Sequence, residues 1–269
     1  MRRIRIMGLS LIAVFALGAV VAGNAFALPE VGRCVSKAGG KYTEAACLTK
    51  ASGTKPKLYE WEKNAVKIGF TATGGEGVLE TKAGTKVVCT AQSAKGDYLA
   101  KGATPSTKEV NKVVATFTGC TLPVISASCN TKGDPSGTII TDALKGPMGY
   151  VSGEKTKTPV IGQELTPETK KGSFAEFECG AGAVKIVVKE GPGKGGNCVI
   201  SPLSEVNVMS TTVGETYSGS AGVQNPQHFQ KTPTKICNLE SAANGGTPER
   251  ATQGLETTIT NEEALEVKA

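Results

Sequence analysis

Short runs of alternating apolar and polar residues dominate the chain from residue 66 onward. Such alternation places one side of a strand against a core and the other side toward water. Glycine, proline and small polar residues separate the runs, as is typical of turns between strands. The strand-like runs span 66–71, 77–82, 86–91, 98–101, 110–118, 137–144, 148–152, 173–179, 183–189 and 206–212.

Three further polar stretches indicate turns within this series. Lys95-Gly96-Asp97 and Lys145-Gly146-Pro147 each carry turn residues between apolar runs. At the end of the chain, Asn261-Glu262-Glu263 separates the runs 255–260 and 264–267, which predicts a terminal hairpin.

The pattern predicts an all-β fold, either a sandwich or a barrel, of roughly ten or more short strands. Beyond the first 27 residues, no stretch shows three turns of helical periodicity. The chain has 30 threonines, which favour strands, together with 34 glycines and 13 prolines.

The organisation we expect is one β domain with a small module in front of it. Residues 28–64 hold two cysteines and little apolar content, so they should pack on the β domain rather than form their own core. Residues 65–269 form the β domain, in which the polar, Gly- and Pro-rich segment 219–252 is expected to be a long loop.

The first 27 residues have the layout of a secretory signal peptide. Arg2, Arg3 and Arg5 precede an apolar stretch over 9–22, and Ala25-Phe26-Ala27 is a small-x-small cleavage site. The apolar stretch is shorter than the about 20 residues that a membrane-spanning helix needs. We therefore expect export, to the outside of a bacterial cell or to its wall.

Charge gives little indication of a partner. The three arginines of the signal segment account for half of the formal net charge of +6. The remaining lysines are interspersed with threonine and glycine, which is a solvated surface rather than a nucleic-acid footprint. We expect a cell-wall polysaccharide or another surface protein as partner, and no nucleic acid.

The eight cysteines indicate a disulfide framework, because an exported chain meets an oxidising compartment. No Cys-x-x-Cys pair occurs, which disfavours zinc ribbons and thioredoxin-type redox sites. The pairs we expect are Cys34–Cys47, Cys120–Cys129, Cys89–Cys179 and Cys198–Cys237.

Few residues suggest catalysis. His228 is the only histidine and lies in a polar segment, and we expect no serine, threonine or cysteine with an acid beside it. Paired carboxylates could hydrolyse glycosidic bonds, and Glu176 and Glu178 share a strand face, yet a solvated face explains them equally well. We expect no catalytic residue, no cofactor and no metal site.

Aromatic side chains are the candidate binding residues. Aromatics make up only 5% of the chain, so most are needed in the core. Trp61 and Tyr59 alternate around Glu60 in the small module, a position less typical of a core, and could stack on a carbohydrate.

Several segments together resemble a set of exported actinobacterial proteins of uncharacterised function. The resemblance rests on 28–34 (LPEVGRC), 39–47 (GGKYTEAAC), 58–61 (LYEW), 116–120 (TFTGC), Cys129 and 137–150 (GTIITDALKGPMGY). It implies export and a β-rich fold and brings no activity, ligand or site residue. Cys198 and Cys237 are additions to the shared pattern.

The sequence favours an exported, disulfide-stabilised β protein that binds a partner or serves as a structural surface component. The alternatives are a carbohydrate-binding module and an extracellular hydrolase that uses carboxylates. A protease inhibitor would need a rigid exposed loop across a disulfide, for which 120–129 is the candidate segment.

Overall fold

The structure, a computed structural model, describes residues 29–64, 66–100, 102, 108–154, 156, 158–169, 172–190 and 198–269. Within these ranges the secondary structure consists of nineteen strands and one short 3-10 turn, Pro123–Ile125. The all-β prediction is therefore confirmed. None of the described segments forms a helix of the length and hydropathy needed to cross a membrane. The signal peptide expected at 1–27 lies outside the described residues.

Eight strands close a barrel, which decides between the two architectures left open by the sequence. Each pairs antiparallel with the next, and the last pairs with the first. The thinnest seam joins β15 to β16, through the bridge between Leu203 and Glu215. In order around the barrel the strands are β3 (Ile68–Gly74), β6 (Ala91–Tyr98), β7 (Glu109–Thr118), β11 (Leu144–Ser152), β12 (Val160–Pro167), β15 (Val199–Pro202), β16 (Ser210–Ser220) and β19 (Glu249–Lys268).

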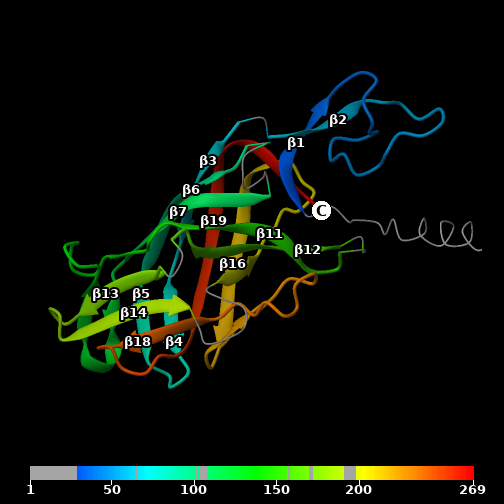
Figure 1. Ribbon diagram of the computed structural model, residues 1–269. Coiled ribbons are helices and arrows are strands. Elements are labelled where there is room, and N and C mark those ends of the chain that lie inside the picture. Colours follow the sequence, from blue (N-terminus) through cyan, green and yellow to red (C-terminus); the bar gives the residue numbers. More distant parts are fainter. Residues whose placement is uncertain are drawn as a thin grey trace, which may run out of the picture.

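The outer strands continue this pairing at one end of the barrel. They pair in series, and both ends of the series return to the first half of β19. In order they are β4 (Gly77–Thr81), β5 (Lys86–Cys89), β8 (Thr121–Leu122), β9 (Ala127–Asn130), β13 (Ala175–Cys179), β14 (Val184–Glu190) and β18 (Leu239–Ala243). β19 is thus common to the barrel and the outer strands, and Figure 1 shows it running through the length of the molecule.

The terminal hairpin expected from the sequence is wrong, because 249–268 form the single strand β19. Alternate residues from Leu255 to Asn261 are buried, and the strand then continues past a register shift against β16 between Thr260 and Leu265 without reversing. Asn261 is itself buried and pairs with Phe70 on β3. The sequence predicts a turn because Asn261, a polar residue, occupies an inward-facing position of the strand that usually carries an apolar side chain.

Two of the expected turns also lie inside strands. Gly96 is within β6, and a Cβ there would lie 2.6 Å from the ring of Phe70. Gly146 is within β11, and a Cβ there would lie 2.0 Å from the carbonyl oxygen of Glu164. Both glycines therefore serve close packing between neighbouring strands rather than chain reversal.

The long loop expected at 219–252 is shorter than predicted. This segment contains β17 (Val223–Asn225), which pairs with β16, as well as all of β18 and the start of β19. β18 has a mixed polar and small sequence whose first four residues are all buried, so it lacks the alternation that reveals a half-buried strand. Residues 226–238 are the longest part without a strand, and 244–248 are a shorter one.

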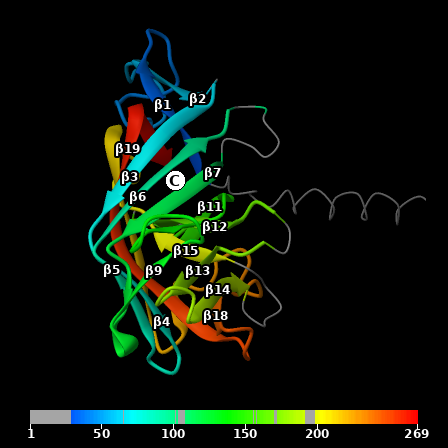
Figure 2. The same ribbon diagram turned by 90° about the vertical axis from the view of Figure 1, so that its left-hand side faces the viewer.

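The small module attaches to the other end of the barrel. β1 (Glu30–Ser36) pairs with β2 (Tyr59–Lys63) on one side and with the end of β19 on the other. The ladder from the barrel therefore continues into the module, as the adjacent strands in Figure 2 show. The remaining strand, β10 (Ile139–Ile140), pairs with β7.

All eight cysteines are paired, and two of the four expected pairs are confirmed. Cys34–Cys47 and Cys198–Cys237 form as predicted. The other two expected pairs are wrong. Cys89 bonds Cys120 and Cys129 bonds Cys179, at Cα separations of 3.9 and 4.0 Å.

Strand pairing explains the two unexpected disulfides. β5 pairs with β8 next to Cys89 and Cys120, and in the β9–β13 ladder Cys129 lies directly opposite Cys179. Each disulfide therefore joins neighbouring strands among the outer strands. Four disulfides indicate that the chain folds in an oxidising environment.

Candidate functional site

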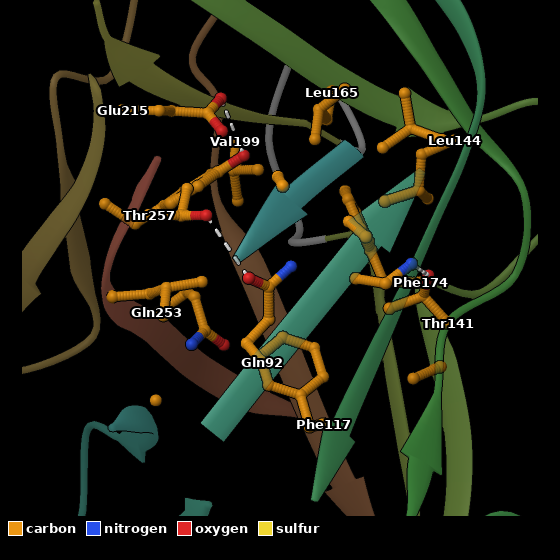
Figure 3. Close-up of a pocket in the computed structure, with 18 of the residues that line it drawn as sticks. Gln92, Phe117, Thr141, Leu144, Leu165, Phe174, Val199, Glu215, Gln253 and Thr257 are labelled. Atoms are coloured by element: carbon orange, nitrogen blue, oxygen red, sulfur yellow. Dashed lines mark hydrogen bonds between the residues drawn. The ribbon is translucent and has the colours of Figure 1, made fainter. Parts of the chain in front are cut away.

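A cavity of about 140 Å³ lies inside the barrel. Its walls are mostly aromatic and aliphatic side chains from both the barrel and the outer strands, including Phe70, Leu144, Leu165 and Phe174. Figure 3 shows Leu144, Leu165 and Phe174 among the side chains around the space. A cavity of about 150 Å³ with an apolar lining is known to hold a molecule as large as benzene. The space therefore suits a molecule with about six carbon atoms.

The cavity exists because one row of inward positions carries only methyl groups. Ala72 on β3, Ala94 on β6 and Ala115 on β7 lie directly opposite one another in the ladder, and all three line the cavity. The row continues into larger side chains at Ile259 on β19 and Val213 on β16. Protein interiors are normally close-packed, so three adjacent alanines on inward positions leave space beside them.

The next inward row is polar, and we refer to it as the polar row. It runs from Glu215 on β16 through Thr257 on β19 and Gly74 on β3 to Gln92 on β6. The hydroxyl of Thr257 donates to Gln92 Oε1 at 3.3 Å and to the backbone carbonyl of Thr73 at 3.0 Å. Figure 3 shows Glu215, Thr257 and Gln92 along one wall of the cavity.

Glu215 is the acid of the polar row and is 8% exposed. The Ser201 hydroxyl donates to Glu215 Oε1 at 2.5 Å, and the Tyr217 hydroxyl donates to the same oxygen at 2.9 Å. Burial raises the pKa of Glu215, and the two hydroxyl donors act against that rise by favouring the ionised form.

Two tyrosines are also part of the lining. Burial raises the pKa of Tyr98 and of Tyr217, and the nearby carboxyl of Glu215 raises both further. Tyr98 packs against Phe70 with ring centroids 5.0 Å apart. The described residues that line the cavity include no lysine, arginine or histidine.

The predicted binding residues lie elsewhere, in the small module. Trp61 and Tyr59 are both half-buried on β2. The ammonium of Lys268 lies 4.6 Å from the Trp61 ring centroid and 4.3 Å from that of Tyr42. It also donates a hydrogen bond to the carbonyl oxygen of Cys47. The Trp61 ring therefore already contacts a cation of the same chain, and carbohydrate stacking on Trp61 and Tyr59 stays a prediction.

A second buried acid, Glu266, lies on the same face of the module sheet as Trp61. Glu266 is directly opposite Gly32 in the ladder between β19 and β1 and is 0% exposed. Its two carboxyl oxygens accept no hydrogen bond from the described residues. Burial raises the pKa of Glu266 to about 7, while the charge of Lys268 acts against the rise.

The residues considered for catalysis do not come together with the cavity. His228 follows β17, with Nδ1 3.3 Å from the carbonyl oxygen of Phe229. Glu176 and Glu178 lie on the outward side of β13, and Glu178 is directly opposite Lys185 in the ladder between β13 and β14. Among the described residues, Glu164, Cys198 and Cys237 lie close enough to hold a metal ion, but both sulfurs are committed to a disulfide.

Sequence reasoning missed Glu215 and the other residues of the polar row. A signal for Glu215 exists, because it stands between Val213 and Tyr217 in the inward phase of β16. An acid in the apolar phase of a strand indicates either a buried partner or a binding role. The strand predicted at 206–212 ended before this position.

No protein-family model matches the chain, and neither the curated proteins nor the solved structures contain a match. The resemblance to exported actinobacterial proteins therefore stays an expectation.

Proposed function

We propose that this protein is an exported carrier that binds a small, mostly apolar molecule inside its barrel. The observation that carries the proposal is the alanine row over Ala72, Ala94 and Ala115, which lines a cavity of about 140 Å³ inside the barrel. An eight-stranded barrel is just wide enough to hold one small ligand when the inward side chains are small.

Two further features support a binding role over a catalytic one. The cavity combines a mostly apolar lining with a few polar groups on one wall, which is the usual composition of a ligand site. Four disulfides fit a protein that acts in an oxidising environment outside the cytoplasm.

Filling the cavity tests the proposal. Benzene and 1-hexanol are the probes, with binding followed by ligand-observed NMR and by the rise of Tm with probe concentration. We expect both probes to bind the wild-type protein and neither to bind Ala94→Leu, because the leucine occupies the space of the ligand. The same substitution should raise the free energy of unfolding by about 1 kcal/mol, since it fills a void.

A matched control comes from the same strand. Ala91 is exposed on the outward side of β6, so Ala91→Leu makes the same chemical change away from the cavity and should leave probe binding unchanged. A wild-type protein that binds neither probe contradicts the proposal. So does an Ala94→Leu variant that binds as tightly as the wild type.

A further inference from the structure

Glu215 lacks the cation that Glu164, another buried acid among the described residues, has. Glu164, 2% exposed, forms an ion pair with Lys235. Glu215 is similarly buried, yet among the described residues it has two hydroxyl donors and no ion pair. Keeping an acid in an apolar interior costs free energy unless a partner compensates it. The missing positive charge therefore points to a group that comes from outside the chain.

The hydrogen bonds of Glu215 leave one oxygen available for that group. Ser201 and Tyr217 both donate to Oε1, so Oε2 accepts nothing from the described residues. The two donors also favour the ionised carboxylate and so prepare it for a cation. A ligand nitrogen that donates to Oε2 would give each oxygen of the Glu215 carboxylate a hydrogen-bond donor.

The polar row and the alanine row are adjacent, so a nitrogen bound at Glu215 would lie next to the apolar part of the cavity. Glu215 and Thr257 are paired in the polar row, and the adjacent inward row leads from Ile259 to the three alanines. A short hydrocarbon can lie along the alanine row while its end group reaches Glu215. Figure 3 shows the Glu215 carboxyl among the lining side chains, opposite the apolar wall of Leu144 and Leu165.

Charge then ranks the end groups that the cavity accepts. An ammonium gains an ion pair with Glu215, and an alcohol gains a hydrogen bond. A carboxylate would lie beside the acid in a lining whose described residues supply no cation. Tyr98 and Tyr217, the other ionisable groups of the lining, stay uncharged because burial raises their pKa values.

We infer that the ligand is a small apolar amine, bound as an ammonium ion to the carboxylate of Glu215 with its hydrocarbon along the alanine row. The inference rests on the proposed carrier function and narrows its ligand class. Where Glu215 is protonated before binding, the arriving ammonium displaces that proton into solvent, so the complex forms with release of one proton and no change in total charge.

Three probes with the same six-carbon chain test this inference: hexylamine, 1-hexanol and hexanoate. Titration calorimetry on the wild-type protein should show hexylamine binding roughly ten- to a hundredfold more tightly than 1-hexanol, the effect of one charge-assisted bond in a buried site. Hexanoate should bind most weakly. In Glu215→Gln the amine should lose this preference, while 1-hexanol binds as before.

Glu256→Gln is the control, because Glu256 is exposed on the neighbouring strand β19 and should leave the ranking unchanged. A second measurement needs no variant: in buffers of different ionisation heat, at a pH low enough to protonate Glu215 in the free protein, hexylamine binding to the wild type should release protons and 1-hexanol binding should not. Equal affinity for amine and alcohol, or an amine preference that survives Glu215→Gln, overturns the inference but leaves the carrier function standing. Failure of all three probes to bind overturns both.

Discussion

Two buried acids, Glu215 in the barrel and Glu266 in the module, differ in where their compensating charge comes from. Glu266 has Lys268 two residues away on the same side of β19, and the rings of Tyr42 and Trp61 hold that ammonium in place. Glu215 has hydroxyl donors from Ser201 and Tyr217 and no cation in the described lining. The module thus has a cation near its acid, whereas the described lining of the cavity has none.

This difference separates a structural role from a binding role. A site that already has a cation near its acid, with aromatic rings around that cation, stabilises the junction between module and barrel. A site with one charge and empty space beside it bears a cost that a ligand can relieve. The two sites should therefore respond oppositely to substitution, the module in stability and the cavity in ligand affinity.

The largest effect should come from Glu266→Gln, measured by urea unfolding at pH 5 and pH 7. The pKa of Glu266 is about 7 in the folded chain and near 4.5 in the unfolded chain. The unfolded chain therefore loses this proton first, and wild-type stability falls as pH rises from about 4.5 to 7. The fall should reach at most about 3 kcal/mol, since one pKa unit corresponds to about 1.4 kcal/mol.

In Glu266→Gln most of that pH dependence should disappear, while hexylamine affinity stays at the wild-type value. Glu256→Gln, exposed on the same strand, should keep the wild-type pH profile. A variant that retains the full loss of stability between pH 5 and pH 7 would show that Glu266 is not the group responsible.

Lys268→Met should have the next largest effect, a loss of about 1–2 kcal/mol in the free energy of unfolding. Methionine keeps most of the apolar stem but removes the ammonium that contacts Tyr42 and Trp61. Thermal unfolding measures the change, with Lys67→Met as control, because Lys67 pairs with Asp97 at the surface. Equal stability of the two variants would argue against a structural role for the module site.

Ser201→Ala should have the smallest effect on stability, about 1 kcal/mol for the loss of one buried hydrogen bond. Removing the Ser201 donor should raise the pKa of Glu215 further, because that donor favours the ionised carboxylate. Hexylamine affinity should therefore fall severalfold while 1-hexanol affinity stays constant. Ser93→Ala, exposed on β6, is the control, and an unchanged amine affinity in Ser201→Ala would separate Ser201 from ligand binding.

Local pattern was enough to predict much of the secondary structure. The strand predicted at 110–118 is β7 (Glu109–Thr118), and the one predicted at 183–189 is β14 (Val184–Glu190). Both segments are rich in β-branched residues, which favour strands. The pattern failed where an inward position is glycine or polar, as at Gly96, Gly146 and Asn261.

The cavity could not be predicted in the same way, because it depends on register between distant strands. Ala72, Ala94 and Ala115 are ordinary residues in their own segments and form a row only through the β3–β6–β7 ladder. The same holds for Cys129 and Cys179, which are 50 residues apart and directly opposite one another. Among the cavity residues, only Glu215 could have been recognised from the local sequence, because it is a charged residue between the inward-facing Val213 and Tyr217.

The shared strand β19 has a consequence for how the chain is made. It comes after every one of its partners in the sequence, from β1 to β18, and both the barrel and the outer strands close through it. A chain emerging N-terminus first, from a ribosome or a secretion channel, can complete neither closure until β19 is out. The fold is thus held open during transit by its own strand order, and the cavity stays incomplete until β19 has emerged.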